Sequence, residues 1–354
     1  MAEKNGIVYF VGSQINGFRA IDAATGSIVW EDTSHGCGAT MPVFFKNGKI
    51  GYLETSTLFL FNSDGSFDKI VTFGGPDFCG ASQLVAFGNS VYFATKDHGF
   101  VTFNIDTDIT LNGTEWKAIP TQLYANPPDL DGDGRICWLP PAIQDGILYS
   151  GVNPVWAHPG TFFAIKLADR TVLWETVGKN LEAWSFWPLT YLDGKLYVLD
   201  PFGFGIIDAT TGALLVEHNV YYAGGMSAGG YFYKNRVYYT GASEASNEDN
   251  PNNVKCVDLA TGNAVWMQSF PYSHGSNPVC YEGITYVLAQ ECMRILDAET
   301  GALLAYDTTV HGDIWQECNV LAYKDTLIVK NGDDLICVKM DFRTDGKGKL
   351  WQVK

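Results

Sequence analysis

The feature that most constrains this chain is a repeated phrase of strands and turns. Each copy has a turn and an apolar strand, a second strand that ends in Asp, a Thr-Gly turn, and a third strand that often ends in Trp. Weaker copies fill the gaps, so the chain divides into eight units of about 44 residues, the length of a four-stranded propeller blade. The clearest copies place the Asp and the Thr-Gly at Asp22 and Thr25-Gly26, Asp208 and Thr211-Gly212, Asp258 and Thr261-Gly262, and Asp297 and Thr300-Gly301.

The physical chemistry of this phrase favours a propeller. Each unit is a short antiparallel meander that cannot bury both of its faces alone, whereas radial packing buries both and leaves only short edges. The Asp can accept hydrogen bonds from local backbone N–H groups and the Gly can adopt a positive φ, so each Thr-Gly makes a tight turn. The Trp offers a large apolar surface to a neighbouring blade. Eight copies of one phrase disfavour the alternative, a pair of β-sandwiches.

The predicted fold is all-β: a single domain over residues 1–354 that forms an eight-bladed β-propeller of four-stranded antiparallel blades. The first copy begins at Asn5, which leaves four residues before it, too few for a comfortable inner strand. Blade 1 is therefore predicted to be incomplete, either three-stranded or joined by a partner strand where the ring closes. The expected blades span residues 5–32, 37–73, 79–118, 137–176, 184–218, 225–269, 274–307 and 315–354.

The phrases at residues 20–30, 256–266 and 295–304 resemble the tryptophan-docking repeat of quinoprotein-like β-propellers. That family includes pyrroloquinoline-quinone alcohol dehydrogenases and the scaffold lipoprotein of bacterial outer-membrane protein assembly. The resemblance covers essentially the whole chain and implies the fold rather than a function, because propellers host many functions. The quinone dehydrogenases of the family carry an adjacent Cys-Cys pair near the cofactor, and this chain has none. We therefore expect that the protein requires no cofactor, and in particular that it does not bind pyrroloquinoline quinone (PQQ).

Charge and hydropathy exclude several classes of protein. The chain has 23 Lys and Arg against 39 Asp and Glu, a formal charge of −16, which disfavours nucleic acid and anionic membrane surfaces as partners. No apolar run approaches the roughly 20 residues that span a bilayer, so the chain is not expected to cross a membrane. Residues 1–4 lead into a strand without the pattern of a signal peptide. The location is predicted to be periplasmic, cell-surface or secreted, after removal of a signal, with a cytoplasmic location as the alternative.

The two faces of the predicted propeller differ in character. The turns between the first and second strands (A–B) are short and those between the third and fourth (C–D) repeat Thr-Gly, so their face is predicted to be structural. The D–A and B–C connections are richer in His and Trp, and setting the blades in register places part of them at the mouth of the central channel. Such residues either plug the channel or line a concave ligand site. The candidate ligand-binding residues are His35, Trp184, Trp187, His274, His311, Asp313 and Trp315, with Trp156 from a B–C connection.

An acidic segment matches the start of an EF-hand-type calcium loop. Asp129, Asp131 and Asp133 alternate, so that three carboxylates can point at one hard cation, and a following Gly allows the sharp turn. The match then fails, because Pro140 occupies the twelfth position, where a bidentate Glu is expected. The segment is therefore either a variant calcium site without flanking helices or an acidic surface turn.

The sequence contains neither a His-Glu-x-x-His zinc motif nor a P-loop. We therefore expect a non-catalytic, monomeric propeller that acts as a binding or scaffold module for a protein or carbohydrate through its D–A and B–C face. The alternative is an enzyme, either a quinoprotein-like oxidoreductase or a propeller polysaccharide lyase.

Overall fold

Every regular element in the described part of the chain is a β-strand. In that part no helix is long and apolar enough to cross a membrane. The computed structural model describes residues 1–12, 17–35, 41–54, 56–73, 84–95, 98–127, 137–153, 159–178, 181, 189–200, 203–219, 228–241, 252–270, 278–288, 292–308, 310, 320–331, 334–340 and 349–353.

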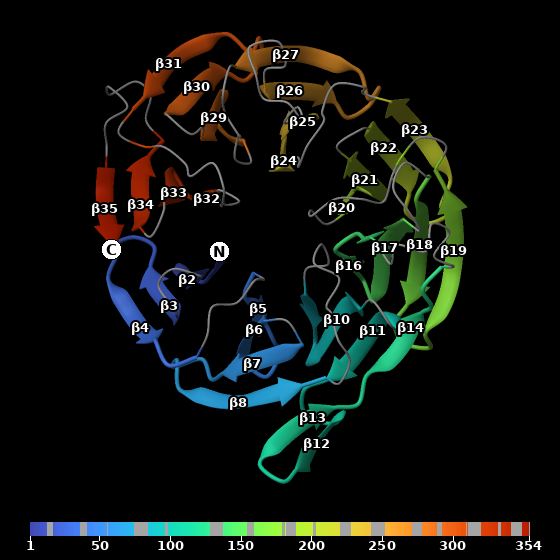
Figure 1. Ribbon diagram of the computed structural model, residues 1–354. Helices are drawn as coiled ribbons and strands as arrows, with labels where there is room; N and C mark the ends of the chain where they lie inside the picture. Colours follow the sequence, from blue (N-terminus) through green and yellow to red (C-terminus); the bar gives the residue numbers. More distant parts are fainter. Residues whose placement is uncertain are drawn as a thin grey trace.

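The strands form eight sheets that surround a central axis as the blades of a ring (Figure 1). In each blade the chain runs from an inner strand near the axis to an outer strand at the rim, and successive strands pair antiparallel. This arrangement confirms the predicted all-β, eight-bladed propeller. Two blades carry more than four strands: blade 2 gains a hairpin from blade 3, and blade 4 has two short inner strands that pair with the same neighbour.

From the axis outwards, the strands of the first four blades are as follows. Blade 1 has β1 (Ala2–Lys4), β2 (Ile7–Gly12), β3 (Gly17–Asp22) and β4 (Ile28–Asp32); blade 2 has β5 (Val43–Phe44), β6 (Ile50–Glu54), β7 (Thr57–Phe61) and β8 (Phe67–Thr72). Blade 3 has β9 (Val85–Phe87), β10 (Ser90–Thr95), β11 (Gly99–Asn104) and β14 (Thr121–Tyr124), with the hairpin β12 (Ile109–Asn112) and β13 (Glu115–Ala118) inserted before β14. Blade 4 has β15 (Cys137–Trp138) and β16 (Ala142–Gln144), then β17 (Ile147–Asn153), β18 (Thr161–Lys166) and β19 (Thr171–Val177).

The second half of the ring is more regular. Blade 5 has β20 (Thr190–Leu192), β21 (Lys195–Asp200), β22 (Gly203–Asp208) and β23 (Leu214–Asn219); blade 6 has β24 (Ala228–Tyr233), β25 (Arg236–Gly241), β26 (Asn252–Asp258) and β27 (Ala264–Phe270). Blade 7 has β28 (Val279–Tyr281), β29 (Ile284–Leu288), β30 (Met293–Asp297) and β31 (Leu303–Asp307); blade 8 has β32 (Val320–Tyr323), β33 (Thr326–Asn331), β34 (Asp334–Lys339) and β35 (Lys349–Val353).

Apolar side chains fill the interfaces between neighbouring blades. Side chains alternate between the two faces of a strand, and a blade has a neighbour on each face, so its middle strands are apolar at nearly every position. Among the described residues, a cluster of buried apolar side chains spans each of the eight interfaces. The core is therefore a ring of packed interfaces around the axis.

Blade 1 is complete, and the prediction that it would be three-stranded or take a partner strand is wrong. Ala2 pairs with Tyr9 and Lys4 pairs with Ile7, so residues before the first repeat form the inner strand β1. Three residues are enough because inner strands elsewhere are equally short. The ring closes instead by side-chain packing, since Met1 and Val8 share an apolar cluster with Ile328 of blade 8.

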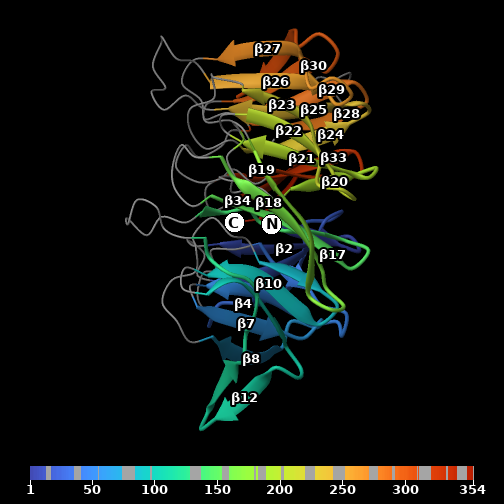
Figure 2. The same cartoon turned by 90° about the vertical axis from the view of Figure 1, so that its right-hand side faces the viewer.

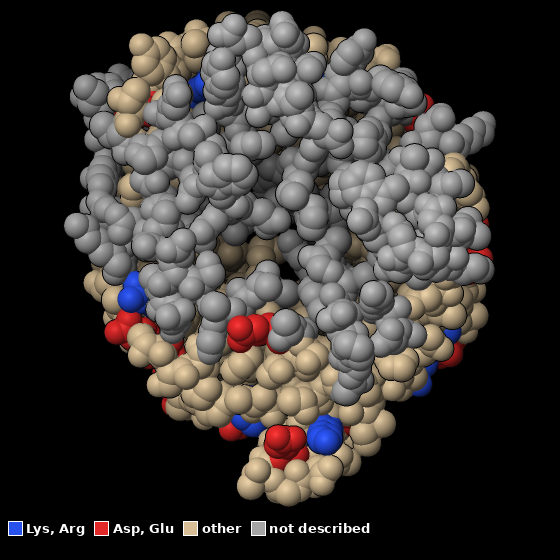
Figure 3. All heavy atoms as spheres, in the orientation of Figure 1, with Lys and Arg blue, Asp and Glu red and all other residues tan. Residues whose placement is uncertain are grey.

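The prediction that blade 3 ends at residue 118 is also wrong, because its outer strand lies beyond that residue. Trp116 lies in β13, which pairs in parallel with β8 of blade 2, and the outer strand of blade 3 is β14. The Nζ atom of Lys69 lies 4.6 Å from the centroid of the Trp116 ring. The hairpin projects beyond the ring (Figure 2), and side chains of both charges lie together on it (Figure 3).

Candidate functional site

The C–D turns of four blades share one hydrogen-bonded geometry. In blade 7 the Oδ1 atom of Asp297 accepts three hydrogen bonds, from Glu299 N (3.0 Å), Thr300 N (2.8 Å) and Thr300 Oγ1 (2.8 Å). The turns that begin at Asp22, Asp208 and Asp258 repeat these three bonds. The Asp-to-Gly phrase is thus a structural turn, as the sequence predicted.

In two of these turns a Trp from the preceding blade docks on the glycine. The indole N–H of Trp266 donates to the backbone oxygen of Ala298 (3.1 Å), and its ring packs on Gly301 in the turn of blade 7. Trp174 of blade 4 donates to Ala209 O (3.0 Å) and packs on Gly212 in the turn of blade 5. In these two cases the Trp of one blade therefore contacts the turn of the next blade both by a hydrogen bond and by packing on its glycine.

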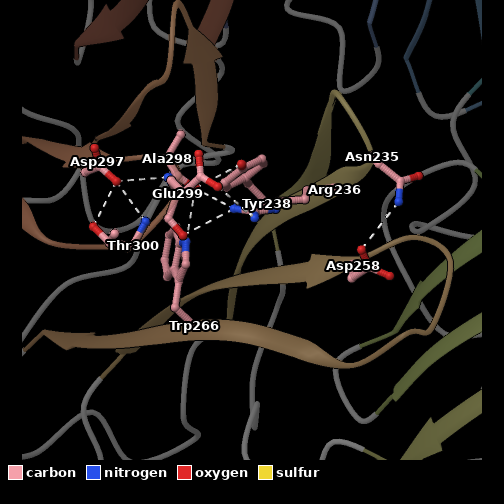
Figure 4. A network of polar contacts seen from close by, with 9 residues as sticks. All are labelled: Asn235, Arg236, Tyr238, Asp258, Trp266, Asp297, Ala298, Glu299 and Thr300. Atoms are coloured by element: carbon pink, nitrogen blue, oxygen red, sulfur yellow. Dashed lines mark hydrogen bonds and ion pairs between the residues drawn. The ribbon is translucent and has the colours of Figure 1, made fainter.

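Further polar contacts reinforce the joint between blades 6 and 7 (Figure 4). Arg236 donates to the backbone oxygen of Glu299 (3.2 Å) and lies 3.4 Å from its carboxylate. The Tyr238 hydroxyl donates to Ala298 O (3.0 Å), the atom that also accepts from Trp266. These polar side chains are engaged in docking the two blades together.

The Asp carboxylates in these turns make the stability of the fold depend on pH. The hydrogen bond from the Thr300 hydroxyl, then that from the Thr300 N–H, holds the pKa of Asp297 below its ordinary value. Equivalent bonds lower the pKa of Asp22, Asp208 and Asp258. A folded-state pKa below the unfolded value of about 4 stabilises the fold above that pH, and this contribution is lost as the pH falls through the folded pKa.

We therefore predict that Asp297→Asn destabilises the protein at pH 7. The difference in unfolding temperature between the variant and the wild type, called the gap below, should narrow below about pH 4. Thermal unfolding followed by circular dichroism between pH 7 and pH 2 measures the gap. Asp169→Asn is a second case in which the same narrowing is expected, because the Thr171 hydroxyl, then Lys166 at 2.9 Å, lowers the pKa of Asp169 in a turn that lacks the Thr-Gly phrase. A gap that stays constant down to pH 2 would contradict the prediction.

His35 is the one ligand-site candidate within the described residues. Its Nδ1 atom lies 2.6 Å from Asp32 Oδ2, and its ring stacks on Phe67, with 3.8 Å between centroids and an interplanar angle of 12°. Phe67 begins the outer strand of blade 2. The described contacts of His35 thus join blades 1 and 2 through an outer strand, and its role at the channel mouth stays a prediction.

The other candidates lie outside the described residues, so their convergence is likewise still a prediction. They are Trp156, Trp184, Trp187, His274, His311, Asp313 and Trp315. The calcium candidates Asp129, Asp131 and Asp133 also lie outside them. Within the part of the chain that is described, no group of three His, Cys, Asp or Glu side chains could hold a metal ion.

A Gly-x-Ser-x-Gly match occurs at residues 225–229. The nucleophile elbow of hydrolases needs such a serine in a sharp turn between a strand and a helix. Here the match leads into the inner strand β24, which begins at Ala228. The local structure therefore lacks the helix that the elbow requires.

Two buried donors were missed by the sequence reasoning. The indole N–H of Trp138 and the Nζ atom of Lys255 are buried, and neither has a hydrogen-bond partner among the described residues. Lys255 stands between Val254 and Cys256 in an apolar strand, and a single basic residue there was the available signal. A buried donor without an acceptor calls for a physical explanation.

No protein-family model matches the sequence, and no curated protein matches it either. Solved structures do match. BamB from Moraxella catarrhalis has a TM-score of 0.65 at 14% identity, covering 93% of this chain and 92% of that one. Quinohemoprotein alcohol dehydrogenase from Comamonas testosteroni gives 0.62 at 12%, covering 94% and 69%. Dihydro-heme d1 dehydrogenase NirN in complex with DHE gives 0.67 at 11%, covering 100% and 73%. The chain thus has the same β-propeller fold as these three structures.

The names of two of these neighbours imply a quinone or a haem, and whether this chain needs either stays a prediction. The described free thiols Cys256, Cys280 and Cys337 are buried in blades 6, 7 and 8. Burial raises the pKa of each thiol. None of them has a cysteine next to it in sequence. We derive no chemistry through a quinone from these residues.

Proposed function

We propose that this chain is a non-catalytic propeller that binds a protein partner through the face formed by its D–A and B–C connections. The observation that carries the proposal is the difference in sequence between the two sets of connections. On the face with the A–B and C–D turns, polar groups join one blade to the next, as in the contacts of Arg236 and Trp266 with blade 7. The connections at the other ends of the strands hold the His and Trp candidates, which no blade-forming turn requires.

The fold similarity is compatible with a binding role, but it does not distinguish a binding protein from an enzyme. The family that the sequence resembles includes both a scaffold lipoprotein and quinone dehydrogenases, so the fold alone serves both roles. The match to BamB extends over 92% of that chain, whereas the match to the alcohol dehydrogenase covers 69% of its chain. We further propose a periplasmic or cell-surface location and a monomer.

Site-specific photo-cross-linking in the source cells tests the face. A benzophenone amino acid at position 184 or 315 is expected to give an adduct of one defined mass. The controls at Leu173 and Leu304, which are 44% and 41% exposed on outer strands, are expected to give none. Adducts that form only from the control positions, or from none of the four, would contradict the proposal. A carbohydrate ligand would instead show as retention on a polysaccharide column that Trp184→Ala and Trp315→Ala abolish.

An oxidoreductase is the second candidate, because two of the fold neighbours are named as dehydrogenases. Titration of the purified chain with PQQ and calcium distinguishes it from a binding module. An absorbance change that saturates near one equivalent would favour the enzyme. A spectrum equal to the sum of its parts would favour the scaffold.

A further inference from the structure

The hairpin of β12 and β13 extends the sheet of blade 2 beyond the ring, and β12 is the last strand of that sheet (Figure 2). The base of the hairpin is anchored, because Ile109, Trp116 and Ala118 pack against the apolar cluster between blades 2 and 3. The Thr72 hydroxyl of β8 also donates to the backbone oxygen of Trp116 (3.3 Å). The structure therefore holds β12 in a fixed place at the rim.

The outer edge of β12 presents backbone groups that the hairpin does not use. The Ile119 N–H donates to Asp108 O (2.7 Å), so these two residues form a hydrogen-bonded pair. Such pairs alternate along an antiparallel ladder with pairs that are not hydrogen-bonded. The N–H and C=O groups of Ile109 and Leu111 therefore point away from β13, towards a side on which no described strand pairs. The Leu111 side chain beside them is 57% exposed.

This edge lacks the features that keep a further strand from adding to a sheet. Proteins protect exposed edges with β-bulges, charged side chains or Pro. In all eight blades the outer strand pairs with its inner neighbour through a register shift typical of a bulge. In contrast, β12 pairs with β13 without such a shift, and its sequence Ile-Thr-Leu-Asn contains neither a charge nor Pro. The edge of β12 is therefore open to another strand.

The charges around the edge favour a basic occupant. Asp106 and Asp108 precede β12 and Glu115 begins β13, and none of the three takes part in an ion pair with another described residue. Lys117 is the single basic residue of the hairpin. A second copy would bring together two chains that each have a formal charge of −16, and these repel each other. A basic segment of a different protein fits the edge better.

We propose that β12 is a docking edge for an extended segment of another protein, one in which apolar residues alternate with Lys or Arg. The segment adds to the sheet of blade 2 as a further strand, bound by the outward backbone groups of Ile109 and Leu111. Because side chains alternate along a strand, its apolar residues lie beside Leu111 on one face and its basic residues lie beside Asp108 on the other. This edge is separate from the D–A and B–C face, so the proposal does not rest on the proposed function.

Fluorescence anisotropy with a labelled synthetic peptide of alternating Val and Lys tests the edge. The peptide is expected to bind the wild-type chain saturably, and at least about tenfold more tightly than a peptide of alternating Val and Glu. A Val–Lys peptide with methylated backbone nitrogens keeps the charge but cannot donate to the edge, so it should also bind at least about tenfold more weakly. Equal binding of the three peptides, or no binding of the first, would overturn the proposal.

The variant Leu111→Pro removes one outward N–H and leaves the hydrogen bonds between β12 and β13 in place, because that N–H is not used within the hairpin. It is expected to weaken binding of the Val–Lys peptide at least about tenfold, with little change in unfolding temperature. Unchanged binding would contradict the proposal. Sedimentation of both proteins tests for a second copy: a wild type that dimerises beside a monomeric Leu111→Pro would assign the edge to self-association and overturn the proposal.

Hydrogen exchange followed by mass spectrometry gives a readout that needs no variant. The Val–Lys peptide is expected to slow exchange several-fold in the segment that contains Ile109 and Leu111. The internal control is β31, an outer strand that pairs through a register shift and exposes Leu303, Leu304 and Tyr306, and its exchange should not change. Equal protection of both strands would mean that the peptide adds to outer edges in general, which would overturn a specific role for β12.

Discussion

Replacing Trp266 by Ala is expected to lower the free energy of unfolding by about 4 kcal/mol. The side chain is 9% exposed, and its ring lies against Gly301 in the turn of the next blade. The substitution leaves a cavity at the joint between blades 6 and 7 and removes the 3.1 Å hydrogen bond to Ala298 O. Urea denaturation monitored by circular dichroism measures the loss.

Two further variants separate burial from hydrogen bonding. Val265→Ala changes the preceding residue of the same strand, which is 41% exposed, and is expected to cost less than about 1 kcal/mol. Trp266→Phe keeps an aromatic ring but not the N–H, and is expected to cost about 1–2 kcal/mol, because Ala298 O still accepts from Tyr238 at 3.0 Å. Similar costs for Trp266→Ala and Val265→Ala would show that the docking contact is not what holds the blades together.

The fold was predictable because its signal is local and repeated. Each copy contains its own strands and its own turn, and the bonds to Asp297 form within four residues. The contact of Trp266 with blade 7 joins residues that are far apart in the sequence, but it recurs at the blade period, as the contact of Trp174 with blade 5 shows. Periodicity therefore revealed both the blade and the joint.

The errors fall where one blade departs from the repeat. The segment Ala2–Lys4 has no apolar alternation of its own, and it forms a strand because the inner edge of β2 offers it hydrogen bonds. Trp116 follows a glycine turn, as a docking Trp would, yet it belongs to an inserted hairpin that pairs with blade 2. Which edge such a hairpin joins depends on the packing of two blades, and that information is absent from either repeat alone.

The candidate site was harder to predict than the fold. Counting along the chain gives a residue's distance from the next inner strand but not its distance from the axis. His35 comes soon after an outer strand, and it packs on Phe67 of the next outer strand. Lys255 was missed because a single basic residue in an apolar strand is expected to face solvent. In the structure Lys255 pairs with Tyr239, and both side chains lie on the face of the strand that packs against the neighbouring blade.

Gly212→Ala is expected to cost about 3 kcal/mol or more, against about 1 kcal/mol for Gly194→Ala. The two glycines lie in blade 5 with nearly equal φ values, +74° and +76°, so an added Cβ strains both backbones alike. At Gly212 the Cβ would lie 2.6 Å from the ring of Trp174, whereas at Gly194 it would meet nothing within 4 Å. The difference between the two losses therefore reports the close approach of the tryptophan.

A double-mutant cycle attributes that difference to Trp174. Once Trp174→Ala has opened the space, adding Gly212→Ala should cost only about 1 kcal/mol, the cost of the backbone conformation alone. The interaction term is then about 2 kcal/mol, well above the error of urea denaturation. Because Trp174 also donates to Ala209 O in the same turn, the single substitution Gly212→Ala displaces both the ring and its hydrogen bond. Additive costs across the cycle would contradict this prediction. They would mean that the turn accommodates the new methyl group without displacing Trp174, so that the tryptophan contact contributes little to joining the two blades.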